Sequence, residues 1–279
     1  GQKMAADLHI HSTYSDGSFS PEEIINIAGK KEIDVIAIAD HDTIDGIKPA
    51  REAGDEIGVE VIPALEFSTF RGKEEIHILG YYIDYQDKQL NHIIKKIFNA
   101  RDIRARKMID LLNDVGVEIS YSQVKGIAGD DYLGRPHIAR AMLNDGYIEE
   151  MGEAFTKKYI GNGGKAYVSK YKLSPEKAIK IIKEAGGIPV LAHPVFINHG
   201  EALKRDDILQ LVEMGLEGIE VFHSKHDDKA TKYYKEIARY MGLLITGGSD
   251  FHGKNSPDVK LGDILIEENY IDQLKEANK

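Results

Sequence analysis

The chain has 279 residues, 42% hydrophobic and 29% charged, which is typical of a folded globular protein rather than a disordered or fibrous one. Its formal net charge of -10 disfavours duplex nucleic acid as a partner, because that partner needs a broad basic surface. A small phosphorylated substrate is compatible with this charge, since bound metal ions can supply positive charge locally. The absence of cysteine excludes disulfides, thiolate metal sites and a cysteine nucleophile, so any bound metal must use nitrogen and oxygen ligands.

Targeting and membrane signals are missing from the sequence. No apolar run approaches the ~18 residues of a membrane-spanning helix, and the N-terminus has no secretory signal pattern. We therefore expect a cytoplasmic protein without a membrane partner. Gly1-Gln2-Lys3, before Met4, resemble an expression remnant and are excluded from the functional reasoning.

The first ninety residues alternate short apolar runs, rich in β-branched residues, with amphipathic segments. The runs cover residues 5–11, 34–40, 59–69 and 74–84. This alternation indicates βα units around a parallel sheet. Ser20-Pro21-Glu22-Glu23 marks one helix start with a capping serine, a first-turn proline and a glutamate three residues after the cap, and Ser174-Pro175-Glu176 repeats the cap and proline.

The middle of the chain has a different pattern. Between residues 86 and 173, helical segments punctuated by glycine predominate, including Leu90 to Leu112 and Pro136 to Leu143. The last part returns to alternation, with apolar runs at 188–193, 216–222, 243–250 and 263–266. We therefore predict an α/β fold in which residues 4–85 and 174–279 form a barrel domain. Residues 86–173 form a helical insertion packed over one end of that barrel.

Histidines and acids recur at the ends of these apolar runs or just beyond them. In a (β/α) barrel, the carboxyl ends of the strands converge on one mouth, so such residues would meet there. The pattern therefore predicts a metal site. Its candidate ligands are His9, His11, Asp16, His41, Glu66, His77, His193, Asp250 and His252.

The early motifs are ambiguous when each is considered alone. His9-Ile10-His11 places both imidazoles on one face of a strand, because side chains alternate with period two, but such a pair is common without metal. Asp16, in a Tyr-Ser-Asp-Gly turn, has the alternative of only closing that turn. Asp40-His41-Asp42 is more informative, since three polar residues directly follow a buried strand.

The later motifs differ in strength. Glu66 lies in an apolar run, where an unpaired carboxylate would be costly, and bridging two ions would remove that cost. His77, between Ile76 and Ile78, is better explained as a core histidine when it is considered alone. His193 follows a buried run, and Asp250 and His252 share a face after two glycines that permit close backbone approach.

Together, and in this order, the motifs resemble those of the polymerase and histidinol phosphatase (PHP) family. The resemblance covers residues 4–84 and 186–266 and is carried by Asp7-Leu-His-Ile-His11, Ala39-Asp-His-Asp42, Ala192-His-Pro194 and Ser249-Asp-Phe-His252. It implies a distorted (β/α)7 barrel, similar to a TIM barrel, that binds two to three divalent metal ions. The family pattern implies one ion at His9, His11, Glu66 and Asp250, a second at Glu66, His77 and His193, and a third at Asp16, His41 and His252.

Nitrogen and oxygen ligands without sulfur suit manganese, zinc or iron(II). Paired ions lower the pKa of a bound water, so we expect metal-bound hydroxide to attack a phosphate ester, with no catalytic side chain beyond that hydroxide. Serine hydrolase chemistry is disfavoured because no Gly-x-Ser-x-Gly elbow surrounds Ser249. Gly161-Asn-Gly-Gly-Lys165 lacks the spacing of a phosphate-binding P-loop.

Candidate substrate contacts lie mainly in the insertion. Arg101 and Arg104 stand at helical i,i+3 spacing, although a solvated helix face is the alternative for each. Gly134-Arg135-Pro136-His137 presents two cationic groups at a helix start, which favours an anion. His223 follows the sixth apolar run. We expect it either to contact the phosphate or to have a structural role.

These insertion features resemble the PHP branch that contains the bacterial 3′,5′-nucleotide bisphosphate phosphatases and ribonuclease AM. The resemblance implies a small nucleotide or a short 5′-phosphorylated oligonucleotide as substrate, with insertion cations holding the 5′-phosphate. A histidinol-phosphate phosphatase is the alternative on the same fold. A catalytically silent metal-binding regulator is the alternative from another class, and the full ligand set argues against it.

Overall fold

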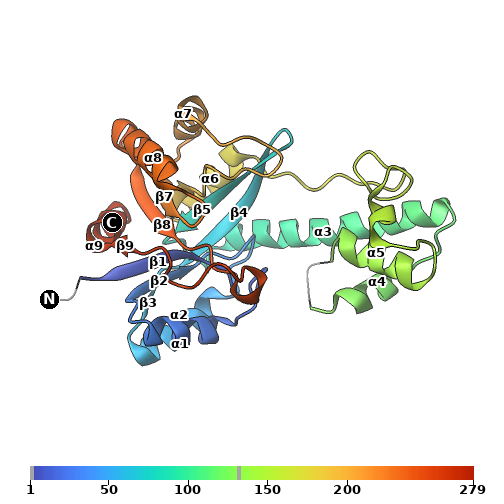
Figure 1. Ribbon diagram of the computed structural model, residues 1–279, viewed down its shortest axis with the longest axis horizontal. Helices are drawn as coiled ribbons and strands as arrows, with labels where there is room; N and C mark the ends of the chain where they lie inside the picture. The colour runs from blue at the N-terminus through green and yellow to red at the C-terminus, as the bar shows by residue number, and fades with distance from the viewer. Residues whose placement is uncertain (1–2, 131–132) are drawn as a thin grey trace. The chain divides into compact units, whose positions relative to one another are not determined.

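The computed structural model describes residues 3–130 and 133–279, and the chain divides into two compact units (Figure 1). The residues up to Asn91 and Lys172–Lys279 form the first unit, and His92–Tyr171 form the second. Helix α3 (Lys88–Asp114) begins in the first unit and continues into the second. Within the described residues, no helix is both long and apolar enough to cross a membrane.

The strands of the first unit form two mixed sheets. One sheet has the order β3 (Glu60–Val61), β2 (Val35–Ile38), β1 (Ala5–Ile10) and β9 (Ile266–Glu267). The other has the order β4 (Ala64–Arg71), β5 (Glu74–Tyr81), β6 (Ile188–Leu191), β7 (Gly218–His223) and β8 (Leu244–Gly248). The α/β class predicted from the sequence is confirmed.

Strand direction departs from the expected parallel arrangement. β1, β2 and β3 pair in parallel, as do β6, β7 and β8. β9 is antiparallel to β1, and β5 is antiparallel to both β4 and β6, so the prediction of parallel βα units is wrong at β9 and β5. At β5 the reason is local: β4 ends at Arg71 and β5 begins at Glu74, which leaves room for a hairpin turn but not for a crossover helix.

The two sheets meet at two seams. In one, an isolated parallel bridge joins Ile10 of β1 to Phe251, which follows β8. In the other, a parallel bridge joins His41, which follows β2, to Glu66 of β4. Across the described residues, continuous ladders do not close a barrel, and these two isolated bridges pair the backbones of the two sheets at their seams.

Helices cover the strands of the first unit, with α1 and α2 on one side and α7 and α8 on another (Figure 1). They are α1 (Pro21–Lys30), α2 (Ile47–Ile57), α6 (Pro175–Glu184), α7 (Arg205–Glu213), α8 (Asp228–Met241) and α9 (Glu268–Ala277). The predicted capping box is confirmed: the Glu23 backbone N–H donates to the Ser20 hydroxyl at 3.1 Å, and the Ser20 backbone N–H donates to the Glu23 carboxylate at 3.2 Å. The Ser174 hydroxyl caps α6 in the same way.

The second unit has its own hydrophobic core. Besides most of α3, it contains α4 (Tyr121–Ala128), α5 (Arg135–Asn144) and the short 3₁₀ helix at Met151–Phe155. Apolar side chains between residues 105 and 166, such as Leu112 and Met142, form one buried cluster. The helices predicted over 90–112 and 136–143 correspond to α3 and α5, which extend one or two residues beyond those limits at each end.

Candidate metal centre

The structure brings the nine predicted ligands together at the strand ends of the first unit. They come from β1 and the loop after it, from β4 and β5, and from the residues that follow β2, β6 and β8. Every histidine among them lies within 4.0 Å, nitrogen to oxygen, of the carboxylate of Glu66, Asp250 or Asp16. These three carboxylates therefore organise the site.

Glu66 is the most enclosed of the three, with 1% of its surface exposed. Its Oε2 lies 2.6 Å from His9 Nε2 and 3.8 Å from His193 Nε2. Its Oε1 lies 3.0 Å from His41 Nδ1 and 3.2 Å from His77 Nδ1. His11 Nε2 lies 3.9 Å from the same Oε1, so one carboxylate faces five imidazoles with both of its oxygens, as a bridging ligand would.

Asp250 faces a second set of imidazoles. Its Oδ1 lies 3.0 Å from His11 Nε2 and 3.3 Å from His9 Nε2. Its Oδ2 lies 3.1 Å from His223 Nε2. Because His9 approaches both Glu66 and Asp250, the two carboxylates border one continuous site.

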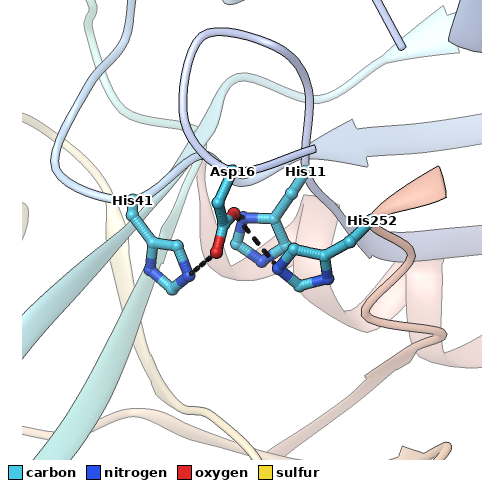
Figure 2. A group of neighbouring side chains, drawn as sticks. All are labelled: His11, Asp16, His41 and His252. Atoms are coloured by element: carbon cyan, nitrogen blue, oxygen red, sulfur yellow. Dashed lines mark ion pairs between the residues drawn. The ribbon is translucent and has the colours of Figure 1, made fainter. Parts of the chain in front are cut away.

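Asp16 gathers a third group at the outer side of the site (Figure 2). Its Oδ1 lies 3.1 Å from His252 Nε2 and its Oδ2 3.5 Å from His41 Nε2, while His11 Nδ1 lies 3.5 Å from Oδ1. One ligand atom from each of these residues lies within 4.8 Å of the others, close enough to share one ion. Figure 2 shows the carboxylate between the imidazoles of His41 and His252.

Several buried polar atoms of this cluster lack a hydrogen-bond partner within the described part of the chain. They are Nε2 of His9 and of His11, Nδ1 of His77, both carboxylate oxygens of Glu66, and Oδ1 of Asp250. A buried polar atom left unsatisfied costs about 1–3 kcal/mol, and such atoms are rare in folded proteins. Here they converge at ion-pair distances, so this donor set fits divalent metal ions, which would satisfy all of them.

The second ring nitrogen of four candidate ligands is held by an oxygen that can only accept a hydrogen bond. The pairs are His9 Nδ1 with Glu220 (2.7 Å), His193 Nδ1 with the Phe196 carbonyl (3.0 Å), His252 Nδ1 with the Asp250 carbonyl (2.7 Å) and His77 Nε2 with Glu75 (2.9 Å). Since that nitrogen must donate, the other nitrogen of each neutral ring offers its lone pair to the cluster. This is the tautomer that a metal ligand needs.

His223 has the opposite arrangement. The Lys225 backbone N–H donates to its Nδ1 at 3.0 Å, so that nitrogen is an acceptor. In the neutral ring, Nε2 must then carry the hydrogen, and it lies 3.1 Å from Asp250 Oδ2. Although His9, His223 and Asp250 are close enough to share an ion, this contact favours His223 as a hydrogen-bond donor rather than a ligand.

Charges within the cluster set its protonation. Burial alone would raise the pKa of Glu66, but the positive charges that His9, His41 and His77 carry when protonated hold it well below its usual value. Burial likewise opposes ionisation of Asp250, and His9 and His11 again hold its pKa low. Both carboxylates are therefore anionic at neutral pH. Burial lowers the pKa of His193 to about 4, which keeps this imidazole neutral and able to bind metal.

Backbone conformation at the site is unusual. His193 and Asp250 have positive φ angles of 25° and 61°, a region that costs non-glycine residues about 1–3 kcal/mol. Gly248 precedes Asp250 where β8 approaches β1, and a Cβ atom there would lie 2.4 Å from the backbone nitrogen of His9. The glycine is therefore required for the two strands to bring His9 and Asp250 together.

Three buried carboxylates behind the site were not among the predicted site residues. Asp7 accepts from the backbone N–H groups of Ser249 and Gly262, both at 2.9 Å. Asp40 accepts from Ser12 N–H, and Glu220 from His9. Asp7 and Glu220 stand inside apolar runs and Asp40 directly follows one, and the cost of burying such a charge is the sequence signal that would have identified them.

A pocket of about 480 Å3 opens beside the centre. It is lined by Asp16, His223, Ser224, Lys225, Ser249, Asp250, His252, Asn255, Ser256 and Val259. Lys225, which the sequence did not single out, lies with its ammonium group 3.3 Å from the centroid of the Phe196 ring. The pocket lining therefore includes a cationic residue as well as the acids Asp16 and Asp250.

The other predicted substrate residues belong to the second unit. Arg101 and Arg104 lie on α3, and Arg104 donates to the Val168 carbonyl at 2.6 Å. Arg135 begins α5 and donates to Asn162 at 3.1 Å. His137 accepts from the Gly134 backbone N–H at 3.0 Å, so it also caps the helix start.

The sequence is similar to that of known phosphoesterases over most of its length. Residues 7–186 match the PHP domain family model. The 5′-3′ exoribonuclease of Haemophilus influenzae is 34% identical over 88% of this chain and 89% of its own length. The phosphoribosyl 1,2-cyclic phosphate 1,2-diphosphodiesterase of Eggerthella lenta is 31% identical, over 90% and 95%. The 3′,5′-nucleoside bisphosphate phosphatase of Chromobacterium violaceum is 33% identical, over 91% and 90%.

Solved structures agree with these matches. A protein of Bifidobacterium adolescentis, assigned as a metal-dependent phosphoesterase, superimposes with a TM-score of 0.75 and 30% sequence identity. The superposition covers 96% of this chain and 94% of that protein. The similarity therefore covers the residues of both units and is not confined to the motifs.

Proposed function

This chain belongs to the PHP domain family and is a hydrolase of phosphoric ester bonds, and on that premise we propose that it acts on a small nucleotide. The preferred substrate is a 3′,5′-nucleotide bisphosphate or a short 5′-phosphorylated oligonucleotide. The observation that carries the phosphoesterase chemistry is the convergence of unpartnered ligand atoms around Glu66 and Asp250. The relatives that act on a nucleoside bisphosphate and on RNA support the substrate class.

The proposed cofactors are three divalent ions, manganese or zinc before iron. One ion would be held by His9, His11, Glu66 and Asp250, a second by Glu66, His77 and His193, and a third by Asp16, His41 and His252. When bound, such ions lower the pKa of a coordinated water and polarise the phosphoryl group. The close grouping of His11 with Asp16, His41 and His252 supports the third position.

The chain's own residues would bind and orient the phosphate. His223 lines the pocket, and its Nε2 hydrogen, which faces Asp250 Oδ2 at 3.1 Å, would be shared with a phosphoryl oxygen once substrate binds. Lys225 would contribute a positive charge to the same group. The Ser224 hydroxyl donates to the Ser249 carbonyl at 2.6 Å, and this hydrogen bond links two residues that line the pocket.

We further propose that the strands enclose a distorted (β/α)7 barrel. The two isolated bridges support this proposal because they connect β1 with β8 and β2 with β4. With the ladders, they give the closed order β1-β2-β4-β5-β6-β7-β8. β3 and β9 lie outside that ring, and the antiparallel β5 is its main distortion.

The second unit is proposed to bind the other phosphate of a doubly phosphorylated substrate. The guanidinium carbons of Arg104 and Arg135 lie 5.7 and 5.8 Å from the centroid of the Tyr167 ring. Burial and the charge of Arg135 lower the pKa of Arg104, so the two cations repel each other. Nη2 of Arg104 is buried without a hydrogen-bond partner within the described residues. A bound phosphate would relieve both costs.

A substrate panel tests the proposed function. Metal-reconstituted protein should hydrolyse adenosine 3′,5′-bisphosphate and short 5′-phosphorylated RNA faster than histidinol phosphate, measured by phosphate or nucleotide release. Activity on histidinol phosphate alone would replace the nucleotide assignment by the histidinol-phosphate alternative. A fully metal-loaded protein without any phosphoesterase turnover would favour the silent regulator.

Arg135→Ala is expected to raise KM for adenosine 3′,5′-bisphosphate about 10- to 100-fold, because a charge-assisted hydrogen bond contributes about 1.5–3 kcal/mol. KM for adenosine 3′-monophosphate, which lacks the 5′-phosphate, should stay within about twofold of the wild type. Arg140→Ala, at an exposed position on the same helix, is the matched control. An equal rise for both substrates would remove Arg135 from 5′-phosphate recognition.

Lys225→Met is expected to raise KM about tenfold for the bisphosphate and the 3′-monophosphate alike, since Lys225 would contact the phosphate that both share. Steady-state kinetics on the two substrates measure this. Lys229→Met, exposed at the start of α8, is the control for lost surface charge. A change confined to the bisphosphate would assign Lys225 to the other phosphate.

A further inference from the structure

Glu220 is a fully buried carboxylate that none of the four PHP-like motifs contains. It lies on β7 with 0% of its surface exposed. Its Oε2 is 2.7 Å from His9 Nδ1, and its Oε1 accepts from the His193 backbone N–H at 2.9 Å. Glu220 therefore contacts two candidate ligand residues that come from different strands.

Both contacts require an oxygen that accepts. The His193 backbone N–H can only donate, and the nitrogen of His9 must donate if its Nε2 is to bind metal. A carboxylate has two accepting oxygens and no hydrogen, whereas the amide of glutamine has only one acceptor. At this position glutamate can accept both hydrogen bonds, whereas glutamine could accept only one of them, and the two side chains also differ in charge.

The position of His9 Nε2, the ring nitrogen that does not contact Glu220, shows why the choice of acceptor affects the metal centre. His9 Nε2 lies 2.6 Å from Glu66 and 3.3 Å from Asp250, and it has no hydrogen-bond partner within the described residues. If an amide donated to Nδ1, the neutral ring would carry its hydrogen on Nε2. The lone pair directed at the centre would then be lost.

We propose that Glu220 is a positioning residue that holds His9 in its Nδ1–H tautomer and so presents Nε2 to the metal centre. Through the His193 backbone it also fixes the loop that carries a second ligand. Burying an anion costs free energy. If Glu220 only linked two strands by hydrogen bonds, a neutral side chain would do so at a lower cost. The inference rests on the proposed function only in taking His9 and His193 as ligands.

Metal titration of metal-free Glu220→Gln tests the proposal without any substrate. Calorimetry with Zn²⁺, and Co²⁺ absorption, should show one ion bound about 10- to 100-fold more weakly than in the wild type, the usual effect of losing a carboxylate behind a metal-bound histidine. Glu217→Gln removes the same charge from an exposed position three residues earlier and should bind like the wild type. Wild-type affinity and stoichiometry in folded Glu220→Gln would overturn the proposal.

A second measurement uses the wild-type protein and does not depend on the variant folding. In the zinc-loaded protein with ¹⁵N-labelled histidine, the His9 resonances, assigned by their loss in His9→Gln, should show a hydrogen on Nδ1 and none on Nε2. A hydrogen on Nε2, or zinc bound through Nδ1, would overturn the inference. Failure of the proposed function appears separately, as intact metal binding without turnover on any phosphate ester.

Discussion

Glu66→Gln is expected to lower kcat/KM by more than about a thousandfold, since the Lewis acidity of a bound ion is worth several kcal/mol and about 4 kcal/mol corresponds to that factor. The amide has one accepting oxygen and no charge, whereas Glu66 faces His9 and His193 with one oxygen and His41 and His77 with the other. Metal content measured by emission spectrometry should fall by at least one ion per chain.

The control for this variant is Glu267→Gln, an exposed carboxylate on β9. It should keep wild-type activity and metal content, because an exposed charge contributes little. Circular dichroism and the melting temperature establish whether Glu66→Gln is folded. A folded Glu66→Gln protein with full metal content and near wild-type kcat/KM would refute the bridging role of Glu66.

Removing the metal ions with a chelator is expected to abolish activity and to lower the melting temperature by about 10 °C. A ligand at a thousand times its dissociation constant stabilises the native state by about 4 kcal/mol. In a folding unit of 150–250 residues, each kcal/mol shifts the melting temperature by about 2–4 °C. The unsatisfied atoms of Glu66 and Asp250 in the metal-free site add to this loss. Adding manganese or zinc should restore both activity and stability.

Hydrogen exchange provides an internal control for that experiment. Metal binding should slow exchange in β1, β4 and the loop after β8, where the candidate ligands lie. The core of the second unit, around Leu112 and Met142, contains none of the candidate ligands and should exchange at an unchanged rate. Protection confined to the second unit would show that the ions bind elsewhere.

The sequence predicted much of the local structure because the relevant signals are local. The cap at Ser20 precedes its helix by one residue, and the α5 start at Arg135 follows from adjacent glycine and proline. The mixed direction of the strands was missed at β5, because alternating apolar residues do not distinguish a parallel from an antiparallel neighbour. There the short turn between Arg71 and Glu74 decided the direction.

The nine candidate ligands and the phosphoesterase chemistry could be proposed from the sequence alone, since histidines and acids recur along the apolar runs in an order that resembles the PHP motifs. The tertiary structure decided which nitrogen of His9 faces the centre, and the local backbone decided it for His223. His9 depends on Glu220, which lies 211 residues away in the chain, and His223 depends on a backbone N–H that makes it a donor. The contact between His9 and Glu220 forms only when β1 and β7 come together in the fold, whereas His223 meets its partner two residues along the chain. In both cases the tautomer of the histidine follows the hydrogen-bond partner that the fold supplies and not the residue itself.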